Sequence, residues 1–189
     1  MKTNTTNKSS GNTLALTMAL LGIFGFTAAS FAGESTSSAS AGAGHNGPGT
    51  ATASAGYSGN GAGIVRTNTR SGNNFSIGRG VSVGIDEDGL TLSASHAVAT
   101  RNGPAIASNF NLSIGRDGSV SSSRGVSVAT GGESRTAFAG GGSATTRSAN
   151  VATSTAGGST IRGGRVHATT RSDTTRRTIA PRRVYRIRR

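Results

Sequence analysis

The sequence predicts a mainly β protein with a large disordered fraction, in which two related β-hairpins form a small antiparallel sheet or sandwich. Gly/Ser/Thr/Ala-rich low-complexity segments flank the hairpins. The prediction rests first on the region 74–139, where apolar and small residues alternate with the period of two that is typical of strands. It rests also on the scarcity of large apolar residues elsewhere, which leaves most of the chain without the side chains of a conventional core.

Residues 1–32 have the composition of a signal peptide. The first 13 residues contain two lysines and no acid, and an uncharged, largely apolar run extends over residues 14–26. Ser30 and Ala32 then give the small-x-small pattern of a signal-peptidase site. The apolar run is shorter than the roughly 20 residues of a membrane-spanning helix. We therefore expect the chain to be secreted or to reach the cell envelope or surface. Retention of the segment as an N-terminal anchor is the alternative.

Residues 33–73 and residues 140–170 are predicted to be low-complexity linkers. Both segments consist mainly of glycine, serine, threonine and alanine, and neither contains a long apolar run. Pro48 and several Gly–Asn pairs further disfavour regular structure in the first segment. Such compositions are typical of flexible connections.

The first hairpin is predicted at Phe75–Ile85 and Leu90–Val98. Apolar residues fall on odd positions in the first strand and on even positions in the second, with small residues between them. The intervening residues 86–89 (Asp-Glu-Asp-Gly) have turn chemistry, and Gly89 is able to take a positive φ. Alternating carboxylates also occur in calcium loops. The twelve-residue pattern with its closing Glu is missing, so we interpret this segment as a solvated turn.

The second hairpin follows Pro104. Apolar residues alternate over 110–114, Arg116-Asp117-Gly118 supplies a turn, and valines continue the pattern to residue 128. Residues 74–79 match residues 111–116 at an offset of 37, and the Gly-Val-Ser-Val of 80–83 recurs at 125–128. These matches indicate duplication of a hairpin, although two copies are fewer than a solenoid requires. Residues 74–139 are therefore predicted to be a β-hairpin repeat region.

The two faces of such a sheet differ in chemistry. One face is apolar and must be covered, and the other is lined by small residues that permit close stacking of sheets, as in silk-like packing. We expect the sheet to be completed by other copies of the chain. The alternative is a marginal monomeric sandwich or a poorly ordered segment.

Residues of the types that catalyse reactions or bind metals are sparse. We therefore expect that the protein is not an enzyme and that it has no cofactor, no small-molecule substrate and no metal site. The chain has no cysteine, and its three histidines, at positions 45, 96 and 167, lie in unrelated contexts. No nucleophile elbow or phosphate-binding loop is present. Asn74-Phe75-Ser76 and Asn111-Leu112-Ser113 fit the N-glycosylation pattern, which has meaning only in a eukaryotic source.

The strongest candidate for binding is a basic tail at residues 171–189. It contains one acid, Asp173, and eight arginines, with an apolar and aromatic group at 184–187 among them. The predicted anion-binding residues are Arg171, Arg176, Arg177, Arg182, Arg183, Arg186, Arg188 and Arg189. Guanidinium groups pair with phosphate and carboxylate, so lipid head groups, cell-wall polymers and extracellular nucleic acid are the expected partners. A solvated tail that only aids solubility is the alternative.

Two hypotheses for function follow. In the first, the chain is a secreted or cell-surface non-enzymatic structural or matrix protein that self-associates through its β region. In the second, it is a binding module whose Arg-rich tail docks an anionic polymer or a membrane surface. The repeat arginines Arg79 and Arg116 either contribute to that docking or are ordinary residues beside turns.

Overall fold

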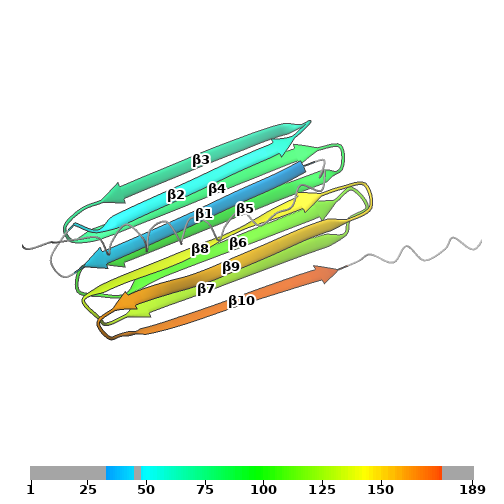
Figure 1. The fold of residues 1–189 in the computed structure, drawn as a ribbon. Coiled ribbons are helices and arrows are strands. Elements are labelled where there is room, and N and C mark those ends of the chain that lie inside the picture. Colours follow the sequence, from blue (N-terminus) through cyan, green and yellow to red (C-terminus); the bar gives the residue numbers. More distant parts are fainter. Residues whose placement is uncertain (1–32, 45–47, 176–189) are drawn as a thin grey trace, which may run out of the picture.

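The fold was analysed in a computed structural model, which describes residues 33–44 and 48–175. These residues form ten antiparallel strands and no helix (Figure 1). The strands are β1 (Gly33–Gly44), β2 (Thr50–Gly59), β3 (Ala62–Ser71), β4 (Phe75–Asp86), β5 (Gly89–Thr100), β6 (Ala105–Gly115), β7 (Val120–Thr130), β8 (Ser134–Thr145), β9 (Asn150–Ile161) and β10 (Arg165–Thr175). The predicted signal peptide and residues 176–189 of the basic tail lie outside the described residues.

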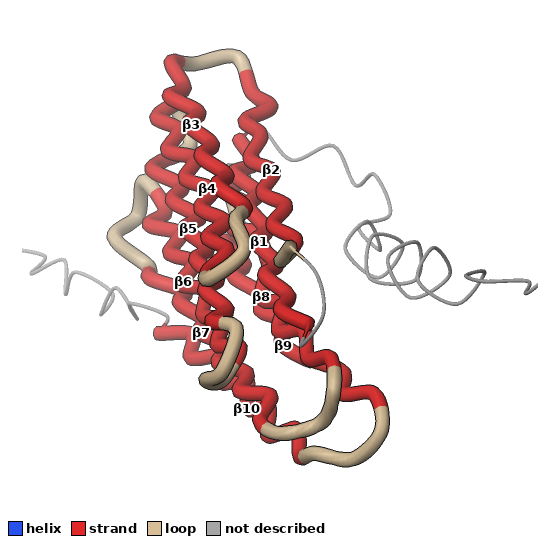
Figure 2. Tube along the Cα trace, turned by 90° about the vertical axis from the view of Figure 1, so that its left-hand side faces the viewer, coloured by secondary structure: helices blue, strands red, loops and turns tan. Residues whose placement is uncertain are grey.

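The strands form two sheets that stack face to face. The larger sheet has six strands in the order β10-β7-β6-β5-β4-β3, and the smaller has four in the order β2-β1-β8-β9. Figure 2 shows the two layers side by side, with β3 and β10 at opposite edges of the larger one. In Figure 1 the axes of the strands keep nearly the same orientation from one edge of each sheet to the other, so the sheets are little twisted. The prediction of a mainly β protein with antiparallel sheets is therefore confirmed.

Both predicted hairpins are present in the larger sheet. β4 pairs with β5 from Phe75 opposite Thr100 to Asp86 opposite Gly89, and β6 pairs with β7 in the second hairpin. The first turn closes as predicted: Gly89 has a φ of 147°, and the Asp86 carboxylate accepts the backbone N–H groups of Asp88 at 2.9 Å and Gly89 at 3.1 Å. Gly118 has a φ of 79° in the second turn. The two hairpins are neighbours and form the middle of the six-stranded sheet.

The matching sequence segments do not occupy equivalent positions in the two hairpins. Residues 74–79 lie at the start of β4, whereas residues 111–116 lie at the end of β6. The match between 80–83 and 125–128 relates β4 to β7, the second strand of the other hairpin. The strand positions therefore do not support a duplicated hairpin. Alternation of a small residue with a valine or isoleucine produces similar short words in any strand of this sheet.

The segments predicted to be linkers are strands, which corrects the sequence interpretation. Residues 33–73 contain β1, β2 and β3, and residues 140–170 contain the second half of β8, all of β9 and the start of β10. Their small residues pack because the interior of this sandwich is narrow. Ala41 of β1 and Ala139 of β8 are fully buried, and their neighbours on the interior face of each strand are alanine or glycine. Low complexity here is the composition of a thin core.

The interior is lined mainly by small residues, and most of the large apolar residues face outward. Along β4 the buried positions are Ser76, Gly78, Gly80, Ser82 and Gly84, while the apolar residues between them are exposed or half-buried. The core cluster consists of alanines from β1, β5, β6, β7 and β8. The small-residue face is thus stacked as predicted, but its partner is a second sheet of the same chain.

Hydroxyl and amide groups join the two sheets directly. Ser35 and Ser37 of β1 meet Thr91 and Ser93 of β5 at 2.8 Å between side-chain oxygens. Ser143 of β8 donates to the backbone oxygen of Leu92 in β5 at 2.9 Å, across the interface. A serine side chain is short, so these bonds require the sheets to lie closer than the roughly 10 Å of an ordinary sandwich.

Glycines permit the closest approach. A β-carbon at Gly78 or Gly80 of β4 would collide with the backbone oxygens of Thr52 and Ser54 in β2. The ring of Tyr57 lies between the sheets over Gly63 and Gly84, in space that a side chain at either glycine would fill. The glycines of β4 are therefore packing residues, fixed by the backbone opposite them.

Arg135 closes one end of the interior. It lies on β8, is only 5% exposed, and donates from Nη2 to the backbone oxygen of Thr100 at 2.8 Å. It also donates to the backbone oxygens of Arg101 and Gly103 in the same β5–β6 turn. The buried guanidinium is thus bonded to carbonyl oxygens, and it fixes the turn against the opposite sheet.

Candidate functional site

The outward surface of the six-stranded sheet, here called the outer face, is the candidate site. Residues paired across an antiparallel sheet point to the same side, so the register gives rows of side chains that cross all six strands. One central row consists of Arg171, Arg124, Phe110, Ala94, Val81 and Arg66. The next row consists of Thr169, Val126, Ser108, His96, Arg79 and Asn68.

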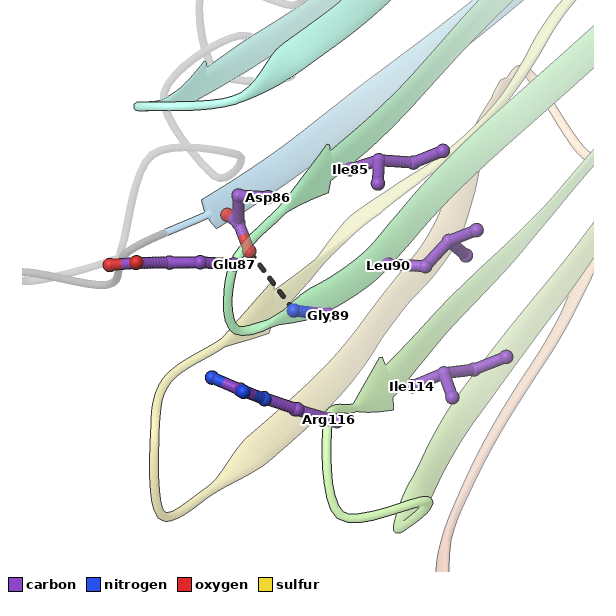
Figure 3. A pocket seen from close by; sticks show the side chains of 8 residues that line it. Ile85, Asp86, Glu87, Gly89, Leu90, Ile114 and Arg116 are labelled. Atoms are coloured by element: carbon purple, nitrogen blue, oxygen red, sulfur yellow. Dashed lines mark hydrogen bonds between the residues drawn. The ribbon is translucent and has the colours of Figure 1, made fainter.

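Large apolar side chains cover much of the outer face and remain accessible. Phe110 is 44% exposed, Ile85 56% and Ile64 64%. At one end of the face, Figure 3 shows Ile85, Leu90 and Ile114 from three neighbouring strands pointing the same way. They line an open hollow together with Asp86, Glu87, Gly89, Gly115 and Arg116. In Figure 3 the side chains of Glu87 and Arg116 point away from the three apolar side chains. Contiguous apolar surface of this extent is typical of an interaction site.

Arginines supply most of the charge on the outer face. By the register, they are Arg66, Arg70, Arg79, Arg124, Arg165 and Arg171. All six are exposed. The acid among the strand residues on this side is Asp173, which accepts Nε of Arg171 at 2.9 Å. The acids at 86–88 and Asp117 belong to the turns at one end of the sheet.

The arginines of the central rows lie close to one another. Arg124 is directly opposite Arg171, and Arg79 is diagonal to both Arg66 and Arg70. Like charges at directly opposite positions destabilise a sheet, and a bound anion relieves this repulsion. The guanidinium of Arg70 lies 5.1 Å from the centre of the Phe75 ring, a cation–π distance.

His96 lies in the middle of the outer face. Its Nδ1 accepts Nε–H of Arg79 at 3.2 Å, which requires that nitrogen to be unprotonated. Partial burial, and then the positive charge of Arg79, lower the pKa of His96 below its ordinary value of 6.5. The imidazole is therefore neutral at pH 7 and becomes a further cation in acid.

The edges of the larger sheet are long and open. β3 pairs only with β4 and β10 pairs only with β7 within the described chain. All 10 residues of β3 and all 11 of β10 are exposed. Edge strands present a row of backbone N–H and C=O groups to any further strand.

Of the predicted tail residues, the structure places Arg171 alone, on β10, and the other seven lie outside the described residues. Arg79 lies on the outer face, whereas Arg116 lies in the β6–β7 turn, where its N–H donates to the backbone oxygen of Asp88 at 2.9 Å. The sequence analysis missed Arg66, Arg70, Arg124 and Arg165. Each of these arginines occupies an outward position on its strand, but they form one group only when strands that are distant in the sequence pair in the sheet.

The other sequence motifs have simpler environments. Asn111 is fully buried, and its Nδ2 donates to the backbone oxygen of Thr153 at 2.8 Å, so it is a core residue and not an accessible glycan acceptor. No group of three or more His, Cys, Asp or Glu residues that could hold a metal ion occurs within residues 33–44 and 48–175. In the same residues no helix is long and apolar enough to cross a membrane.

Comparison of the chain with protein-family models, curated proteins and solved structures found no significant match. The outer face and the two open edges must be interpreted from their own geometry.

Proposed function

We propose that the protein is a secreted or cell-surface, non-enzymatic structural or matrix protein that self-associates by strand pairing between copies. The observation that carries the proposal is the pair of open edges on the six-stranded sheet. β3 and β10 have nearly equal lengths, and every residue in them is exposed. The export signal predicted at residues 1–32 supports a location outside the cell.

The directions of the edge strands suit an open assembly. Each strand in the sheet is antiparallel to its neighbours, so β3 and β10 run in opposite directions (Figure 1). A second copy, shifted sideways without rotation, would bring its β10 beside β3 as one more antiparallel pair. The contact uses two different edges, so it does not close on itself, and repetition produces a filament.

The charge on these edges sets the conditions for assembly. β3 carries Arg66 and Arg70, and β10 carries Arg165 and Arg171, so the two edges repel each other at low ionic strength. Positive side chains on edge strands are a known restraint on edge-to-edge pairing. The Debye length is about 10 Å at 0.1 M salt and shortens as salt is added, so the repulsion weakens and assembly is expected to increase with salt.

Cysteine cross-linking tests the proposal, because the chain has no cysteine of its own. Asn68→Cys in β3 and Thr169→Cys in β10 are made as separate full-length variants and mixed with a short bifunctional thiol reagent. We expect cross-linked heterodimers whose yield rises with protein concentration and salt. The matched control mixes Thr52→Cys in β2 with Thr155→Cys in β9, the edges of the smaller sheet. Monomers at every concentration, or equal yields from both mixtures, would refute pairing through β3 and β10.

A further inference from the structure

We propose that the outer face of the six-stranded sheet binds flat against an anionic lipid surface. This function is additional to self-association and does not depend on it, because strand pairing uses the edges and leaves the face free. The observation behind the proposal is the combination, on one side of one sheet, of exposed large apolar side chains with arginines and very little negative charge.

The outer face is large enough for such a contact. Six strands about 4.8 Å apart, each with roughly ten residues of about 3.3 Å, cover on the order of 900 Å². Its apolar side chains are those that normally fill a core, yet here the core is built from alanine, serine and glycine on the opposite side. Since the smaller sheet covers only the inner side, water contacts this apolar surface in the isolated chain.

The arginines lie where lipid head groups would meet them. Arg79, Arg124 and Arg171 occupy the two central rows, with Val81, Phe110 and Val126 between them. An arginine has a long apolar stem that lies along apolar surface while its guanidinium stays in the polar layer. The apolar side chains would enter the boundary between head groups and acyl chains, and the guanidinium groups would pair with phosphates around them.

Charge selects this partner over a second copy of the chain. Stacking two outer faces would bring their arginines together. The acidic strand residue on each face is Asp173, which already pairs with Arg171. Like charges brought together at an interface oppose association. The apolar segment 14–26 is a weaker candidate for this surface, because it is predicted to be removed at export and the residues that precede it are also positive.

A soluble anionic polymer fits the face less well than a lipid layer. A polysaccharide or a nucleic acid duplex would satisfy the arginines but would leave Ile64, Ile85 and Phe110 in water. A lipid surface offers phosphates to the arginines and acyl chains to the apolar side chains, in adjacent layers of the same surface. The lipid proposal therefore requires that both kinds of side chain contribute to the same binding.

The experiment is co-sedimentation of the full chain with vesicles of phosphatidylcholine and phosphatidylglycerol at 3:1, with pure phosphatidylcholine for comparison. The charge variant is Arg79→Ser with Arg124→Ser, and its matched control is Arg101→Ser with Arg147→Ser, two exposed arginines of the β5–β6 and β8–β9 turns whose loss leaves the same net charge. The apolar variant is Phe110→Ser. Its control is Ile161→Ser on the smaller sheet, since Phe110 and Ile161 are both 44% exposed.

We expect strong binding to the anionic vesicles and weak binding to the neutral ones. One cation near an anionic lipid surface contributes roughly a factor of five, so the charge variant should bind about 25-fold more weakly than the unmodified chain. Phe110→Ser should also bind more weakly by roughly tenfold, as expected for the loss of an apolar side chain from the interface. The two controls should stay within about twofold. Added salt should weaken this binding while it strengthens strand pairing, which separates this result from that of the assembly test.

Several results would overturn the proposal. Equal losses in the charge variant and its control would show that net charge alone attracts the vesicles. Unchanged binding in both face variants, with loss on deletion of residues 176–189, would assign lipid binding to the tail. Binding to a DNA duplex that depends on Arg79 and Arg124, together with vesicle binding that ignores Phe110, would indicate a soluble polymer as the partner.

Discussion

Gly80 and Val81 are neighbours on β4. In an ordinary sandwich the valine would be buried and its replacement would cost the more stability, whereas here we expect the larger loss of stability from replacing the glycine. Gly80 faces the interior, where an added β-carbon would collide with the backbone oxygen of Ser54 and lie 3.2 Å from that of Ser38. Both oxygens belong to paired strands, since Ser38 and Ser54 are partners in the β1–β2 register. Rotation of a side chain cannot relieve the contact. Overpacking of a core costs about 1–3 kcal/mol, so we expect Gly80→Val to reach about 3 kcal/mol.

Val81→Ser is the companion change on the outer face. The valine side chain is already 40% exposed, and no residue of the smaller sheet packs against it. The substitution should therefore cost about 1 kcal/mol or less, within the span of strand propensities. The free energy of unfolding should differ between the two variants by about 2 kcal/mol.

Urea denaturation, followed by circular dichroism, measures the difference directly. The two variants share a strand and a chain length, so their denaturant slopes should agree and their midpoints can be compared. A larger loss for Val81→Ser than for Gly80→Val would refute the arrangement, because it would place the large apolar side chains inside. Equal losses would mean that β4 has no defined interior face.

Two further predictions concern single side chains. Arg135→Leu should cost about 2–4 kcal/mol in urea denaturation, because the carbonyl oxygens of Thr100 and Gly103 lose a buried charged donor, whereas Arg147→Leu in an exposed turn should stay within about 0.5 kcal/mol. The pKa of His96 is lowered in the folded state, so protonation favours unfolding, and stability should fall as the pH drops from 6.5 through the folded pKa. His96→Gln should show a smaller fall between pH 8 and pH 5 by the same measurement, and the difference should be modest because the imidazole is only partly buried and remains in contact with solvent. Identical pH profiles would contradict a depressed His96 pKa.

The sequence was sufficient for the middle of the larger sheet. Period-two alternation and two turn motifs identified β4, β5, β6 and β7, because each signal is local to about a dozen residues. The alternation also separated an apolar face from a small-residue face. It did not identify which face would be inside, and the usual expectation that large apolar residues are buried is wrong for β4. Which face is buried depends on the smaller sheet that packs against it. The residues of that sheet, 33–59 and 134–161, show no alternation of large apolar residues that would have predicted its strands.

The candidate site depends even more on pairing between distant strands. Arg66 and Arg124 are 58 positions apart in the sequence, yet they lie in one row because β3, β4, β5, β6 and β7 are consecutive in the sheet. The arginines of the tail could be predicted as a binding site because they are close together in the sequence. A cluster of charges from distant strands is not visible in the sequence. Arg171, the tail residue that the structure places, belongs to the same row.

The narrow interior of alanine, serine and glycine has a thermal consequence. Unfolding raises the heat capacity in proportion to the apolar surface that it newly hydrates, and newly hydrated polar surface lowers it. In this chain many of the large apolar side chains are already in contact with water in the folded state, and the groups released from between the sheets are largely hydroxyl, amide and backbone groups. The curve of stability against temperature should therefore be unusually flat, with cold and heat weakening the fold only slowly.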